Sequence, residues 1–216
     1  MTCYRCKAWP CVCHDGITII HGDCRDVLPQ LEPVDLVLTD PPYGVAYKTS
    51  SSRSVLAIAH DHPPVYGDDE PFDPSPLLVY ERLIVWGGNH FADRLPASPT
   101  WLIWDKRCGL AQNDSADCEI AWSNLGGPAR IYRHLWMGML RDSEAGTSYH
   151  PTQKPIALMR WCIEQADESD LILDPFMGSG TTLRAAKDLG RKAIGIEIEE
   201  RYVEIAAKRL SQERLL

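Results

Sequence analysis

Leu171–Thr182 reads LILDPFMGSGTT, an apolar strand-like run that ends in an acid and a loop containing two glycines. A helical pattern follows over Leu183–Leu189 and stops at a glycine, a residue type that commonly follows a helix end. A second apolar run, Ala193–Ile196, ends in Glu197 and leads to a predicted helix over Glu200–Leu210. Alternating strands and helices of this kind predict an α/β protein with a parallel sheet.

The glycines of the loop, Gly178 and Gly180, let the backbone approach a ligand where the strand turns into the helix. The loop lacks Gly-Lys-Ser/Thr and Gly-x-Gly-x-x-Gly, so it is neither of the two common nucleotide-binding loops. Glu197 ends the next predicted strand, and an acid in that position can accept hydrogen bonds from both ribose hydroxyls of a nucleoside cofactor. This part of the chain therefore predicts a nucleoside-binding site.

Asp40-Pro41-Pro42-Tyr43 follows another apolar run, Val34–Thr39. Open α/β sheets place their chemistry at the carboxyl ends of such strands. Two consecutive prolines remove two backbone donors and stiffen the chain, which leaves a carboxylate, outward-pointing carbonyls and an aromatic ring. Asp40 and the Pro41 carbonyl can accept the two hydrogens of an exocyclic amino group while Tyr43 stacks on the base. The alternative is a proline-stiffened turn with an unrelated acid.

The two motifs together resemble those of S-adenosylmethionine-dependent DNA amino-methyltransferases of the permuted beta group. The tetrapeptide comes first and the cofactor loop last, and His150–Pro155 is similar to the linking motif of that group. The resemblance covers roughly residues 17 to 212. It implies a Rossmann-like, seven-stranded methyltransferase sheet, circularly permuted, and methylation of the N6 amino group of adenine in DNA by base flipping and direct transfer.

The resemblance also implies candidate site residues. The catalytic set is Asp40, Pro41, Pro42 and Tyr43. The cofactor-binding set is Asp23, Asp40, Thr152, Lys154, Asp174, Phe176, Gly178, Gly180, Thr181 and Glu197. Within this set, the resemblance places Thr152 and Lys154 at the methionine end of the cofactor and Asp23 near its adenine. Asp23 is equally well explained as the N-cap of a short helix over Arg25–Leu31, and both interpretations can hold.

Three other functions remain as alternatives. Cytosine-N4 methyltransferases are the nearest, but they more often carry Ser where Asp40 stands. Methyltransferases that act on RNA or on protein glutamine usually show Asn-Pro-Pro-Tyr and place the cofactor loop first. An inactive DNA-binding relic is disfavoured because both motifs are intact.

Four of the eight cysteines lie within the first 13 residues, as Cys3, Cys6, Cys11 and Cys13. Two close pairs joined by a short turn suit tetrahedral Zn²⁺ with four thiolates. A segment this short cannot bury a core of its own, so the metal would supply its folding free energy. We therefore expect a structural zinc knuckle over residues 1–15 and a methyltransferase catalytic domain over residues 16–216. A disulfide is the weaker interpretation in a reducing compartment.

A length of 216 residues, 44% of them apolar, suits one compact catalytic domain. The chain has no apolar run long enough to span a membrane and no signal-peptide pattern at its start, so we expect a cytoplasmic protein with DNA as its partner. The net charge of −8 argues mildly against tight nonspecific DNA binding. Residues 44–78 have the composition of a long loop, expected to face DNA or to close over the site.

Sequence specificity is expected to be short or relaxed. Only Gly138–Ser148 and its edges separate Leu135-Trp136-Met137 from the linking motif. A segment of that length offers few side chains to read bases, each of which contributes roughly 1–3 kcal/mol of discrimination. A homodimer would supply a second reading surface, and that oligomeric state is left open.

Overall fold

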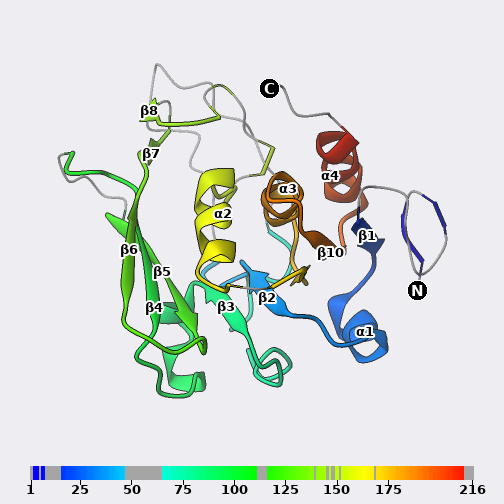
Figure 1. The fold of residues 1–216 in the computed structure, drawn as a ribbon, viewed down its shortest axis with the longest axis horizontal. Coiled ribbons are helices and arrows are strands. Elements are labelled where there is room, and N and C mark those ends of the chain that lie inside the picture. The colour runs from blue at the N-terminus through cyan, green and yellow to red at the C-terminus, as the bar shows by residue number, and fades with distance from the viewer. Residues whose placement is uncertain are drawn as a thin grey trace.

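The computed structural model describes residues 2–4, 6–7, 16–46, 65–110, 116–138, 140–144, 146, 149–150, 152–167 and 169–211. These residues form a mixed α/β fold around one large sheet (Figure 1). Its strands are β1 (Ile17–His21), β2 (Leu36–Thr39), β3 (Leu83–Trp86), β4 (Trp101–Asp105), β5 (Cys118–Ser123), β6 (Arg130–Arg133), β9 (Leu171–Asp174) and β10 (Lys192–Glu197). A small separate hairpin pairs β7 (Trp136–Met137) with β8 (Leu140–Arg141). The helices are α1 (Cys24–Val27), α2 (Ile156–Glu164), α3 (Thr181–Asp188) and α4 (Glu200–Ser211).

The sheet order is β1-β10-β9-β2-β3-β5-β4-β6. The five strands from β1 to β3 run parallel, β5 runs antiparallel to both of its neighbours, and β4 and β6 are parallel to each other. The carboxyl ends of β2, β9, β10 and β4 therefore lie along one edge of the sheet, together with the amino end of β5. We call this the carboxyl edge.

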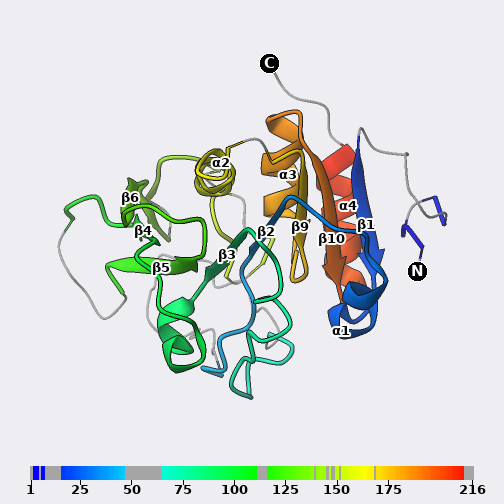
Figure 2. The ribbon, with the colours of Figure 1, turned by 60° about the horizontal axis from the view of Figure 1, so that its bottom comes forward.

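Side chains of alternate strand residues pack into two separate cores. Ile84 and Trp86 of β3 face the layer formed by α2, α3 and α4, whereas Leu83 and Val85 face the loops that contain Leu77. Figure 2 shows the three helices lying along one face of the sheet. Strands buried on both faces need nearly continuous apolar sequence, which explains why β2 and β3 contain almost no charge.

The strands expected at Val34–Thr39, Leu171–Leu173 and Ala193–Ile196 are present, and the fold differs from the sequence expectations in three respects. The sheet has eight strands among the described residues instead of the seven expected, because β6 is added beside β4. The helix expected over Arg25–Leu31 is α1 followed by a 3-10 turn, Leu28–Gln30, since Pro29 cannot donate the next helical hydrogen bond. Helix α2, which covers the centre of the sheet, follows the His150–Pro155 motif and was not predicted.

Candidate active site

The Asp40 carboxylate lies just beyond the carboxyl end of β2 and is bound by two other predicted site residues. The hydroxyl of Tyr43 donates to Oδ1 of Asp40. The ammonium of Lys154 donates to Oδ2 at 2.5 Å and to the Tyr43 hydroxyl oxygen at 3.0 Å. The Asp40 side chain keeps 19% of its surface exposed, whereas that of Lys154 keeps 3%. The structure thus joins the tetrapeptide to the HPTQKP motif through a largely buried ion pair.

Glu119, near the amino end of β5, completes this group and was not predicted. Its Oε2 lies 3.2 Å from Nζ of Lys154, and its Oε1 accepts from Lys106 at 3.0 Å. Residue 119 reaches the carboxyl edge because β5 runs antiparallel, in register with Trp104 of β4. Its sequence context, Cys-Glu-Ile-Ala-Trp, reads only as a strand with one charged residue, so no local signal marks it as part of the site.

The pKa values of Asp40, Lys154 and Glu119 follow from one ammonium placed between two carboxylates. Burial raises the pKa of Asp40 above its usual range, although the charge of Lys154 opposes that shift. Burial acts to lower the pKa of Lys154, but Asp40 and the other anionic neighbours raise it well above its usual value. For Glu119, burial acts to raise the pKa, and the ammoniums of Lys154 and Lys106 lower it to about 2. Lys154 and Glu119 are therefore charged at neutral pH.

The Tyr43 ring is stacked on His90, with centroids 4.9 Å apart and planes inclined by 13°. Its edge lies against Gly87, where a Cβ would come within 2.0 Å of the ring. Gly87 also has a φ of 75°, in the left-handed region that favours glycine. Gly87, just after β3, thus makes room for the tyrosine.

Asp68 holds the backbone that follows the tetrapeptide. Its Oδ1 accepts hydrogen bonds from the amide of Tyr43 at 2.9 Å, of Gly44 at 3.0 Å and of Val45 at 3.4 Å. The residue is buried, with 5% of its surface exposed. It belongs to the loop expected over residues 44–78, of which residues 47–64 lie outside the described residues. The sequence of that loop gives no sign that one of its acids holds the backbone of the tetrapeptide.

The glycine loop, which follows β9, and Glu197, which ends β10, meet at the carboxyl edge. Oε2 of Glu197 accepts from the amide of Gly178 at 2.9 Å, and Oε1 accepts from the amide of Glu199 at 2.8 Å. Burial raises the pKa of Glu197, while these amides oppose the shift. A carboxylate has about four acceptor sites, so Glu197 can accept from a further donor, and the geometry fits a ligand that presents hydroxyl groups.

Asp174 ties two neighbouring strands together. Its Oδ1 accepts from the hydroxyl of Thr39 on β2 at 2.7 Å and from the amide of Phe176 at 3.1 Å. Burial raises the pKa of Asp174 to about 6, and hydrogen bonds from Thr182 and Thr39 oppose the shift. Through these contacts Asp174 holds the glycine loop next to the end of β2, where the tetrapeptide begins.

Buried Arg209 of α4, another residue not predicted, anchors the start of α3. Its guanidinium donates to the carbonyl oxygen of Ser179 at 2.7 Å and to the Ser179 hydroxyl at 2.9 Å. At Gly180, whose φ is 81°, a Cβ would lie 2.9 Å from that of Ala206. Packing against α4 therefore accounts for the glycine at residue 180. Thr181 is buried beside the same guanidinium, at 3.4 Å.

The remaining predicted residues lie around this centre. Thr152 is exposed and its hydroxyl is 3.0 Å from Nδ1 of His150. Asp23 is the N-cap of α1, as one of its two interpretations predicted, and its carboxylate also pairs with Arg25 at 2.5 Å. The cofactor contact expected of Asp23 remains a prediction.

Of the four cysteines expected to bind zinc, Cys3 is buried and forms a β-bridge with Ile20, and Cys6 is exposed. Cys11 and Cys13 lie outside the described residues. Among the residues that the structure describes, no group of three or more His, Cys, Asp or Glu side chains could hold a metal ion.

Within the described part of the chain, no helix combines the length and the apolar character needed to cross a membrane.

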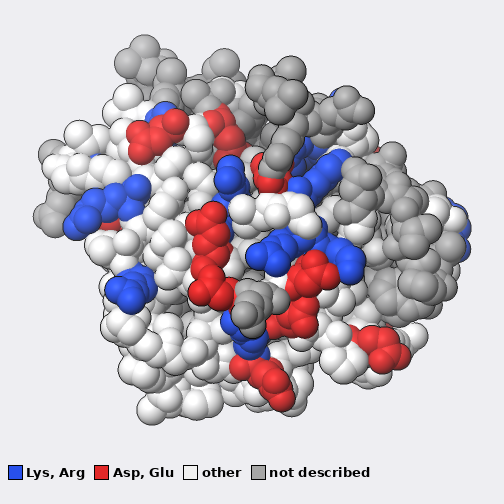
Figure 3. All heavy atoms as spheres, in the orientation of Figure 1, with Lys and Arg blue, Asp and Glu red and all other residues white. Residues whose placement is uncertain are grey.

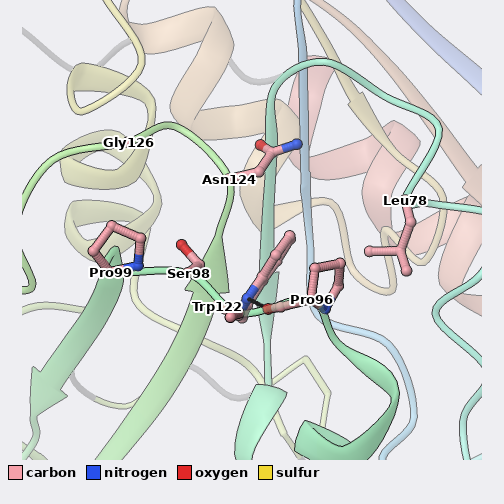
Figure 4. Close-up of a pocket in the computed structure, with 8 residues that line it drawn as sticks. Leu78, Pro96, Ser98, Pro99, Trp122, Asn124 and Gly126 are labelled. Carbon is pink, nitrogen blue, oxygen red and sulfur yellow. Dashed lines mark hydrogen bonds between the residues drawn. The ribbon is translucent and has the colours of Figure 1, made fainter.

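The surface and the cavities do not extend the site. Lys and Arg side chains alternate with Asp and Glu on the face seen in Figure 3, so its described residues form no uniformly basic field. A cavity of about 250 Å³ is lined by Leu78, Pro96, Ala97, Ser98, Pro99, Trp122, Asn124 and Gly126. Figure 4 shows Trp122 beside Pro96, whose carbonyl accepts from the indole at 3.0 Å. This cavity lies by the carboxyl end of antiparallel β5, away from the carboxyl edge, and its lining holds no ionisable group.

Comparisons with known proteins agree with this geometry. A family described as DNA methylase, covering N6 and N4 enzymes, matches residues 100–208, about half of the chain. Type II methyltransferase M2.LlaDCHI of Lactococcus lactis subsp. cremoris is 50% identical over 82 residues, which are 37% of this chain and 30% of that protein. Type II methyltransferase M2.DpnII of Streptococcus pneumoniae is 48% identical over 83 residues, 38% of this chain and 31% of the relative. The matched segment spans less than a third of either relative.

Two solved structures resemble the whole fold. The crystal structure of the M1.HpyAVI–SAM complex is 26% identical, with a TM-score of 0.58, and the match covers 91% of this chain and all of that one. The cytosine-N4-specific PvuII DNA methyltransferase has a TM-score of 0.62 over 93% of this chain and 88% of its own, at 16% identity, which shows the fold alone. The mixed α/β sheet is thus a methyltransferase fold, and the chain belongs to the N6/N4 DNA methylase family.

Proposed function

We propose that this protein transfers a methyl group from S-adenosylmethionine to the N6 amino group of adenine in DNA. The observation that carries the proposal is the Asp40 carboxylate at the end of β2, bound by Lys154 and Tyr43 on the same edge as the glycine loop and Glu197. The permuted order of the two motifs is part of the proposal. In support, β1 begins the chain order yet lies at the sheet edge beside β10, the last strand.

The cofactor would supply an electrophilic methyl group. Glu197, whose carboxylate lies against the glycine loop, would accept from the ribose hydroxyls. Phe176 and the loop of Gly178 and Gly180 would lie around the rest of the cofactor, and Thr152 near its methionine end. The hydrogen bond from the amide of Gly178 to Glu197, at 2.9 Å, supports this placement, because it holds the loop against the carboxylate proposed to bind the ribose.

The target base would be extruded from the duplex before transfer. Asp40 and the Pro41 carbonyl would then accept its two amino hydrogens, which favours a more tetrahedral nitrogen and stabilises the positive charge that develops there. Tyr43 would have to exchange its stacking on His90 for stacking on the base, or receive the base on its other face. The amino nitrogen attacks directly, so the chain needs no nucleophile of its own. Correct positioning contributes much of the acceleration.

Cytosine-N4 methylation is the second candidate, favoured by the fold shared with the PvuII enzyme. Asp rather than Ser at residue 40 favours adenine. Mass spectrometry of nucleosides from DNA incubated with the protein and S-adenosylmethionine separates the two. We expect N6-methyladenine; N4-methylcytosine would transfer the proposal to the second candidate, and no methylated nucleoside would overturn both.

The zinc knuckle over residues 1–15, the catalytic domain over residues 16–216 and relaxed sequence specificity also stay proposals. The hairpin of β7 and β8 supports the last of these, because it offers only a short segment for reading bases. Sequencing of methylated DNA tests it. Strict modification of one long site by a monomer would contradict it.

A further inference from the structure

We propose that Glu119 is a positioning residue for methyl transfer, acting on Asp40 through Lys154. The inference rests on the proposed function and adds a residue to it. Glu119 comes from β5, outside both sequence motifs, yet its carboxylate lies 3.2 Å from the ammonium that binds Asp40. Only 28% of the Glu119 side chain is exposed, so its charge acts in a partly desolvated setting where water screens it weakly.

The first contribution of Glu119 is geometric. An ammonium has three N–H donors. Lys154 donates to Oδ2 of Asp40 and to the hydroxyl of Tyr43, and its ammonium forms an ion pair with Oε2 of Glu119 at 3.2 Å. Without Glu119, nothing on that side attracts the ammonium, and it can move fully onto Asp40. The amino group of a target base needs lone pairs on that same carboxylate, so Glu119 keeps Asp40 available.

The second contribution is electrostatic. Asp40 and Lys154 alone form a neutral pair, which stabilises a nearby positive charge weakly. Glu119 gives the three residues a net charge of about −1, by counting one positive and two negative groups. Lys106 pairs with Glu119 from the outer side, where its own side chain is 20% exposed, against 3% for Lys154. With Lys106 counted, the four residues sum to zero, so Glu119 supplies a carboxylate that offsets the Lys154 ammonium close to the position where the amino nitrogen becomes cationic during transfer.

The two lysine partners of Glu119 provide a matched control. If Glu119 mattered only by tying β5 to the residue after β4, then Lys106→Met would break that link as completely as Glu119→Gln. If Glu119 acts through Lys154, Lys106→Met leaves the essential contact in place. The experiment compares the single-turnover methylation rate of both variants and the wild type, with DNA and S-adenosylmethionine saturating. Cofactor affinity and thermal unfolding are measured in parallel.

We expect Glu119→Gln to lower the single-turnover rate by about 10- to 100-fold, the range seen when outer partners of metal ligands are removed. Lys106→Met should stay within about twofold of the wild type, and cofactor affinity should change little in either variant. Glu119→Asp keeps the charge and should retain most of the rate; it carries the same comparison if Glu119→Gln does not fold. An unchanged rate in Glu119→Gln, or equal losses in Glu119→Gln and Lys106→Met, would overturn the inference. A wild type without methylation would instead overturn the proposed function.

Discussion

The ammonium of Lys154 lies 2.5 Å from Oδ2 of Asp40, although 114 residues separate the two in the chain. The contact joins the tetrapeptide directly to the His150–Pro155 motif, at the carboxyl edge of the sheet. It also gives the buried carboxylate a cation without which ionisation would be costly. The protonation of Asp40 therefore depends on the position of Lys154.

Lys154→Met should shift the pH dependence of methylation. Burial already raises the pKa of Asp40, and loss of the ammonium removes the main opposing charge, so its pKa should rise further. The ionised form of Asp40 is the stronger acceptor for the amino group of the base and the form that stabilises its developing positive charge. As pH falls, the variant should therefore lose its methylation rate at a higher pH than the wild type does. Single-turnover methylation rates across the pH range measure this shift, with Lys106→Met as the control. If Lys154→Met loses its rate at the same acidic pH as the wild type, the protonation of Asp40 does not depend on Lys154.

Asp68→Ala should loosen the tetrapeptide, because three backbone amides lose their common acceptor. We expect the free energy of unfolding to fall by about 1–3 kcal/mol, the cost of leaving buried donors unsatisfied. The methylation rate should fall more than cofactor affinity. Asp68→Asn keeps an acceptor oxygen and should be milder in both respects. Equal behaviour of the two variants in denaturant melts and rate assays would show that the amide contacts do not matter.

Asp174→Asn should flatten the dependence of stability on pH. The folded pKa of about 6 exceeds the ordinary value of 3.8, so the folded state binds the proton more tightly. The protein should gain stability as pH falls from about 6 to about 4, by an amount on the order of 3 kcal/mol at most. The amide keeps the acceptor for Thr39 but does not titrate. Urea unfolding of both proteins at a series of pH values checks this; parallel curves would refute it.

Purified protein should contain about one zinc ion per chain if the cysteines at 3, 6, 11 and 13 bind metal. Replacing both Cys3 and Cys6 with Ser should release the metal, and methylation should persist because that segment contains no motif residue. Cys108→Ser, at an exposed cysteine elsewhere, is the control. If elemental analysis of freshly purified protein finds no zinc, the predicted zinc site is wrong.

The strands and the two motifs could be predicted because their signals are local. Apolar runs such as Val34–Thr39 and Ala193–Ile196 read directly as buried strands. The contacts of the site could not, because they depend on how distant segments are ordered in the sheet. Glu119 reaches Lys154 only because β5 inserts antiparallel between β3 and β4, out of chain order. Likewise, Asp68 and Arg209 look like ordinary charged residues until folding buries them against the tetrapeptide and the glycine loop.

The central claim is that the Asp40 carboxylate binds the amino group that is methylated. The most direct measurement is N6-methyladenine formed in DNA by wild type, Asp40→Asn and Asp40→Ala, quantified by nucleoside mass spectrometry alongside cofactor affinity. Removal of a preorganised partner of the transition state typically costs on the order of 10²–10³ in rate or more. We predict N6-methyladenine from the wild type, a loss of at least that size in both variants, and cofactor affinity largely retained. Near-normal methylation by either variant would contradict the account.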